Sequence, residues 1–218
     1  MSSKKKFGKN EVTCCGVVVD EPIVDYSYRD ESFYSLCIKV NRRSDTSDYI
    51  DVLVSTRLID GGRLKIGTPV KVVGELRSYS DKGNKVKQRL KLQLFADSVE
   101  VMEDDADTSV NSVNLTGYVC REVYEKSTRS NARLGYCMLA VNRNYGKASY
   151  IPILLWGRDS VYVKNLGVGK EIEITGRVQS RTYNDRANNE LVKVLEVSVA
   201  HVSEVKEVME GQDNVDKE

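Results

Sequence analysis

The sequence predicts an all-β protein made of two tandem copies of one domain. Two observations carry this prediction: the chain aligns with itself at an offset of about 101 residues, and both halves alternate apolar with polar residues. In the repeat, Gly16 aligns with Gly117, and the tripeptide Val-Asn-Arg at 40–42 aligns with the same tripeptide at 141–143. A repeat of roughly 100 residues is long enough for each copy to form a small domain.

Alternation within each copy marks half-buried strands. Ile151, Ile153 and Leu155 share one parity and are expected to face a core, while Tyr150 and Trp156 have the opposite parity. One short helix is expected before the fourth strand of each copy, at residues 157–166 and 56–64. Three strands, a helix and two strands form the five-stranded Greek-key barrel called the OB-fold, which binds oligonucleotides or oligosaccharides.

We therefore expect two OB-fold domains. They are copy one (residues 1–102) and copy two (residues 113–204), separated by an acidic linker (103–112) and followed by an acidic flexible tail (205–218). Residues 103–107 carry four acids and no base, and residues 204–218 carry six acids against two lysines. These segments each carry a net charge of −4, which leaves +9 on the rest. A basic body fits a polyanionic partner, and on charge alone it fits a solvated surface with acidic ends equally well.

Composition argues against several other classes of protein. No apolar run approaches the roughly 20 residues that span a bilayer, and the basic start of the chain leads into no apolar segment. A cytoplasmic, nucleoid-associated protein is expected. The five cysteines form no C-x-x-C pair and His201 is the only histidine, so we expect reduced thiols, no metal and no cofactor. The motifs of nucleotide-binding enzymes and metalloproteases are absent from the sequence, which favours a protein that is not an enzyme.

Copy two resembles the bacterial single-stranded DNA-binding protein family. The resemblance rests on the order and spacing of NSVNLTGYV, CMLAVNR, YIPILLWGRDS, LGVGKEIEITGRV and SRTYNDRANNE. Copy one is similar in a more diverged form, with YIDVLVS, IGTPVKVVGEL and SYSDKGN. The resemblance implies sequence-independent binding of single-stranded DNA in replication, recombination or repair. It also implies an assembly of four OB domains, which a chain with two of them reaches as a homodimer.

The resemblance also implies which aromatic residues stack on bases: Tyr145, Tyr150, Trp156 and Tyr183. Parity independently places the last three on non-core faces. A stacked ring needs no particular base, because every base has a π-face. The alternative is that each aromatic packs in its barrel core, as most aromatics in strands do.

Basic residues in copy two are candidates for phosphate contacts. They are Arg143, Arg158, Arg177 and Arg181, with Lys126, Arg129 and Arg133 in the loop between strands 1 and 2. The alternative for each is an ordinary solvated side chain.

Copy one keeps fewer of these residues. It has Tyr49, Tyr79 and Arg42, and it places Lys82 and Lys85 in its loop between strands 4 and 5, but Ser55 stands where copy two has Trp156. We expect copy one to bind DNA more weakly than copy two.

Other functions remain open at this point. A primosome-type adaptor that bridges proteins and binds DNA weakly is the main alternative, and an RNA-binding or oligosaccharide-binding OB domain is another. The last residues, Asn-Val-Asp-Lys-Glu, differ from the Asp-Ile-Pro-Phe tip through which the family recruits replication and repair proteins. Replication or repair proteins therefore stay open as partners, but the resemblance does not imply their recruitment through this tip.

Overall fold

A computed structural model of the chain describes residues 8–28, 31–81, 89–128, 131–143, 146–185 and 189–205. Its strands join into one continuous hydrogen-bonded sheet of twelve strands. The elements of copy one are β1 (Asn10–Val18), β2 (Ile23–Tyr28), β3 (Glu31–Asn41), β4 (Ser47–Ser55), the 3₁₀ turn η1 (Gly61–Arg63), β5 (Pro69–Asp81) and β6 (Arg89–Val101). Those of copy two are β7 (Asn111–Val119), β8 (Tyr124–Ser127), β9 (Arg133–Asn142), β10 (Ala148–Trp156), α1 (Arg158–Leu166), β11 (Glu171–Asp185) and β12 (Glu190–Glu204).

Each copy closes into a barrel with the same strand pairing. In copy one, β1 pairs with β3 and β5, β3 pairs with β4, β4 pairs in parallel with β6, and β6 returns to β5. Copy two repeats this circuit with β7, β9, β10, β12 and β11. This is the Greek-key topology of the OB-fold, so the predicted fold class is confirmed for both copies.

A sixth strand in each copy was not predicted. β2 and β8 each form a hairpin with the strand that follows them, and they are the two edges of the sheet. Lys126 therefore lies on β8 and Arg133 begins β9, and both are paired in the sheet instead of lying in an open loop.

The helix predicted at residues 157–166 is α1, and Val163 anchors it in the core. In copy one the same place holds only the 3₁₀ turn η1, which is shorter than the helix predicted at 56–64. Two adjacent glycines explain the difference, because glycine is a poor helix former. A side chain at Gly61 would also require the Tyr34 ring to move, since its Cβ would lie 2.6 Å from Cζ of Tyr34.

The core of each barrel follows the predicted parity. Ile151, Ile153 and Leu155 are fully buried, and Ile50 and Val52 are fully buried in copy one. Leu154 has the opposite parity and is nevertheless buried. It lies between its cross-strand partners Tyr136 of β9 and Ser198 of β12, which cover it on the outer face of the barrel.

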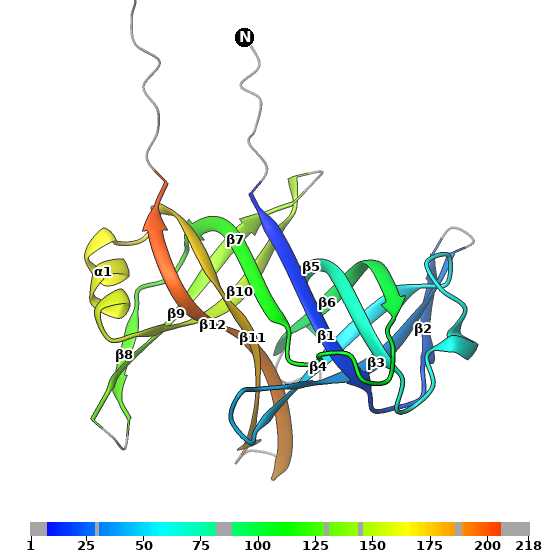
Figure 1. Cartoon of the computed structure of the whole chain (residues 1–218). Helices are drawn as coiled ribbons and strands as arrows, with labels where there is room; N and C mark the ends of the chain where they lie inside the picture. Colours follow the sequence, from blue (N-terminus) through cyan, green and yellow to red (C-terminus); the bar gives the residue numbers. More distant parts are fainter. Residues whose placement is uncertain are drawn as a thin grey trace, which may run out of the picture.

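The two barrels are joined through their first strands. β1 and β7 lie side by side and antiparallel in the middle of the molecule, with Val12 opposite Val113 (Figure 1). The linker runs beside β1 and the end of β3: Cys15 N of β1 donates to Val110 O, and Asn41 N of β3 donates to Thr108 O. These bonds and the shared sheet make the two barrels one body related by an approximate twofold axis.

The cysteines of the barrels are free thiols, as predicted; four are buried and Cys120 is partly exposed. Burial raises the pKa of the Cys14 thiol to about 12 and that of the Cys137 thiol to about 11. Within the described part of the chain, no helix is long and apolar enough to cross a membrane.

Candidate nucleic-acid interface

The non-core face of β10 carries two exposed aromatic rings. Tyr150 is 45% exposed and Trp156 is 42% exposed, so neither packs as core. The indole Nε1 donates a hydrogen bond to Ser198 Oγ over 3.1 Å, which fixes one edge of the ring. Six residues of extended strand place the two rings roughly 20 Å apart on the same face. The face therefore offers two platforms at opposite ends of one strand.

Two further tyrosines belong to this face and were missed by sequence reasoning. Tyr124 of β8 lies opposite Tyr136 of β9, and Tyr136 lies opposite Leu154 of β10. Lys126 Nζ lies 5.4 Å from the centroid of the Tyr124 ring and 5.9 Å from that of Tyr136. The parity of β9 could have revealed Tyr136, because its alternate residues Cys137, Leu139 and Val141 all face the core.

Tyr183 lies on β11 beside a paired arginine. Its ring is 38% exposed, and Arg181 Cζ lies 5.5 Å from the ring centroid. Arg181 Nε also approaches Glu196 Oε1 at 3.4 Å. Glu196 is buried, so the guanidinium compensates its charge as well as accompanying the tyrosine.

Arg42 and Arg177 are turned toward protein instead of solvent. Arg42 makes two bonds to the Asp48 carboxylate, 2.7 Å to Oδ2 and 2.5 Å to Oδ1, and Arg177 Nη1 lies 3.1 Å from Oδ2. Asp48 is fully buried. Both guanidiniums therefore neutralise this carboxylate, and their contact with phosphate stays a prediction.

The other basic candidates differ in their surroundings. Arg158 is exposed where α1 begins. Arg143 is half-buried, and its pKa is lowered by burial and then by the charge of Arg77, so two guanidiniums lie near each other there. Arg133 Nε lies 3.7 Å from a carboxylate oxygen of Glu125.

Four predicted residues, Tyr145, Arg129, Lys82 and Lys85, lie outside the described residues.

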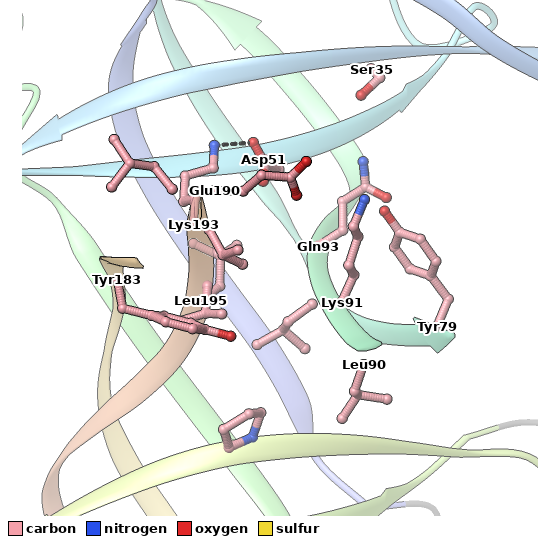
Figure 2. A pocket seen from close by; sticks show the side chains of 15 residues that line it. Ser35, Asp51, Tyr79, Leu90, Lys91, Gln93, Tyr183, Glu190, Lys193 and Leu195 are labelled. Carbon is pink, nitrogen blue, oxygen red and sulfur yellow. Dashed lines mark hydrogen bonds and ion pairs between the residues drawn. The ribbon is translucent and has the colours of Figure 1, made fainter. Parts of the chain in front are cut away.

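A groove of 710 Å³ separates the two hairpins β5–β6 and β11–β12 (Figure 2). Tyr79 and Tyr183 lie on opposite sides of it in this view, and Lys193 and Asp51 form an ion pair at its wall. Pro152 from β10 completes the lining opposite β4, so the groove borders the outer faces of both barrels. It joins the face of copy two to the face of copy one.

The matching face of copy one has a different chemistry. Tyr49 is 43% exposed, as its position predicts, but Ser55 at the place of Trp156 donates to Glu31 Oε1. Arg57 Nη1 lies 3.8 Å from the same carboxyl group. A carboxylate paired with an arginine therefore stands where copy two offers an indole, and it provides no ring for a base to stack on.

The strand register fixes which positions of β5 and β11 are equivalent. Gly74 and Gly176 both follow the register shift of their strand pair, which makes them equivalent. Counted from these glycines, Tyr79 corresponds to Arg181, and Tyr183 lies two residues further along the hairpin. The two tyrosines share a face but are not matched positions.

Fold and face together define a tandem OB-fold protein with an aromatic, partly basic surface on its second barrel. Residues 110–205 match the model of the Single-strand binding protein family. The single-stranded DNA-binding protein of Streptococcus mutans is 32% identical over 114 residues, which cover 48% of this chain and 69% of that protein. Single-stranded DNA-binding protein 1 of Streptococcus pyogenes is 31% identical over 112 residues, with 48% and 82% covered.

The first barrel is included in a comparison of structures. The crystal structure of the single-stranded DNA binding protein from Thermus aquaticus superposes with a TM-score of 0.75 at 18% identity, covering 92% of this chain and 95% of that one. The likeness in structure extends the shared fold over both copies. This chain belongs to the single-strand binding protein family.

Proposed function

We propose that this protein binds single-stranded DNA without sequence preference, chiefly through copy two. The observation that carries the proposal is the exposed aromatic face of β8, β9 and β10, on which Tyr150 and Trp156 stand clear of the core. Stacking of a base on such a ring contributes roughly 1–3 kcal/mol and tolerates any base. The names of the relatives from Streptococcus, both single-stranded DNA-binding proteins, support the same function.

The strand is proposed to follow the face of β10 and then to enter the groove between the hairpins. Trp156 and Tyr150 stack on bases, Arg158 meets phosphate near α1, and Arg143 meets phosphate near Tyr150. Lys126 and Tyr124 extend the surface along β8. In the groove, Tyr183 and Tyr79 would continue the path toward copy one.

Protection of single-stranded DNA during replication, recombination or repair is the role that we propose for this binding. The protein is proposed to act as a homodimer with four OB domains, in the cytoplasm and on the nucleoid. No catalytic step or cofactor forms part of the proposal.

A titration with dT oligomers tests the proposal directly. Trp156 is the only tryptophan in the chain, so its emission reports on this face alone. We expect quenching that saturates with DNA, and a binding constant that falls with salt with a log–log slope of about 0.7 per neutralised phosphate. Unchanged emission at saturating DNA would refute the stacking role. Binding of dT oligomers weaker than about 100 μM at low salt would refute the function, since nonspecific affinity alone reaches that level.

A further inference from the structure

The contacts between the two barrels can be compared residue by residue, because two of them are equivalent. Tyr49 N donates to Ser180 Oγ over 2.9 Å, and Tyr150 N donates to Ser78 Oγ over 2.7 Å. These bonds lie on opposite sides of the twofold axis and join matched positions of the repeat. Every other position on one side therefore has a counterpart position on the other, and the contacts that differ between the two sides can be traced to differences of sequence.

On the first side, a buried carboxylate joins the barrels. Asp48 of β4 accepts hydrogen bonds from Arg42 of its own barrel and from Arg177 of copy two. The backbone N of Ser180 also donates to Asp48 Oδ1 over 2.8 Å. Copy one thus contributes a buried acid, and copy two contributes a partly exposed base and a backbone N–H that bind it.

On the second side, the same positions carry no such pair. Ser149 replaces Asp48, and its Oγ is buried without a hydrogen-bond partner among the described residues. Glu75 replaces Arg177 and is bound by Arg77 of its own strand. Arg143 replaces Arg42 and is not among the donors to Ser149 Oγ. Among the described residues, the bond from Tyr150 N to Ser78 Oγ is the hydrogen bond that joins the barrels at these positions of the second side, and the Glu75 carboxylate acts on Arg143 through its charge without one.

A second charged pair shows the same asymmetry at the groove. Asp51 of β4 accepts from Lys193 of β12, a contact drawn as a dashed line in Figure 2. By strand register the counterparts of these two residues are Pro152 and Leu90, which both line the groove and carry no charge. Copy one again contributes the acid and copy two the base.

We propose that the acids of copy one and the bases of copy two favour the pairing of copy one with copy two and disfavour the pairing of copy one with itself. The interface of copy one fits an OB domain that presents a base at the positions of Arg177 and Lys193. Two copies of the first barrel joined through β1 would instead place Asp48 against Glu75 and leave Asp51 against Leu90. That site would hold two carboxylates with Arg42 and Arg77, whereas in the observed pairing Asp48 faces two guanidiniums and no second carboxylate among the described residues.

The pairing of copy two with itself is also unfavourable, although less so than the pairing of copy one with itself. Two copies of the second barrel would place Arg177 against Ser149 and Lys193 against Pro152, which leaves two bases without acids. Arginine and lysine have long side chains that can turn toward solvent, whereas buried Asp48 cannot. The exclusion therefore acts mainly on copy one, which keeps this barrel from assembling with the same barrel of another chain during folding.

The first test changes the base of copy two in the full chain. Arg177→Glu gives copy two the residue type that copy one carries at this position, and Arg177→Gln is the neutral control. We expect Arg177→Glu to lower the melting temperature by roughly 5–10 °C more than Arg177→Gln, because it adds a second carboxylate beside Asp48. Equal melting temperatures of the two variants would overturn the proposal.

The second test introduces the residues of the Asp48 site at the matched positions of the second side. Ser149→Asp brings an acid against Glu75 and is expected to melt below its isosteric control Ser149→Asn. The triple variant Glu75→Arg, Arg77→Gln, Ser149→Asp reproduces the Asp48 site residue by residue and is expected to melt above Ser149→Asp. This test decides the matter if both variants at position 177 fail to fold. A triple variant no more stable than Ser149→Asp would overturn the proposal.

Discussion

Replacing Trp156 with alanine separates a stacking platform from a structural residue. The indole is 42% exposed and makes one hydrogen bond, to Ser198. Truncation of a fully buried tryptophan costs about 3–5 kcal/mol of stability, and a ring exposed to this extent should cost about 2 kcal/mol, including the lost hydrogen bond. For a chain of this length that corresponds to a fall in melting temperature of roughly 4–8 °C.

Trp156→Ala is also expected to weaken the binding of single-stranded DNA. One base–aromatic stack contributes about 1–3 kcal/mol, which is roughly a 5-fold to 150-fold rise in the dissociation constant. Fluorescence anisotropy of a labelled dT oligomer measures this loss, since the variant has no tryptophan. The titration is run well below the melting temperature so that both proteins remain folded. Trp156→Phe, which keeps a ring but loses the hydrogen bond, should retain most of the binding.

A matched control lies on the helix. Tyr162 of α1 is 40% exposed, close to the value for Trp156, but it lies on α1, outside the strands that carry the aromatic face. Tyr162→Ala should leave the dissociation constant within about 2-fold, because no base stacks on this ring in the proposed path. Normal binding by Trp156→Ala, or an equal loss in both alanine variants, would refute the assignment of Trp156.

Three further predictions test other parts of the structure. Tyr150→Ala should weaken dT binding more than Tyr49→Ala, and equal losses would contradict the dominant role of copy two. Asp48→Asn should lower the melting temperature by roughly 6–15 °C, because two guanidiniums lose their buried counter-charge. A thermal unfolding curve that barely moves would show that the Asp48 site contributes little to stability. Because burial holds the pKa of Cys14 at about 12 and that of Cys137 at about 11, both should stay protonated at pH 8 and react with a thiol reagent far more slowly in the native chain than in denaturant.

The barrels could be predicted because their signals are local and repeated. Alternation at Ile151, Ile153 and Leu155 fixes which face is buried, and a repeat that carries the same alternation doubles the evidence. The helix of copy one was overestimated for a local reason as well, the glycines at 61 and 62. Even the outward placement of Trp156 follows from parity alone.

The basic candidates could not be sorted by sequence, because a charge does not reveal its partner. Arg42 and Arg177 are far apart in the chain, and only the packing of two barrels brings them to Asp48. In the sequence, Asp48 looks like any other polar residue of an alternating strand, so nothing there marks it as buried. Tyr124 was missed for a similar reason, since β8 lies in a segment that the five-strand pattern assigns to a loop.

Fusion of the two copies explains how such an interface can arise. In a symmetric dimer of identical domains, each contact occurs twice, so every surface must carry both the acid and the base. One chain with two copies removes that constraint: Asp48 and Asp51 can gather on copy one while Arg177 and Lys193 gather on copy two. Asp51 occupies the non-core face at the position where copy two has Pro152, and its carboxylate holds Lys193 there. The divergence that we expect to weaken the binding of DNA by copy one is thus the same divergence that we propose for its recognition of copy two.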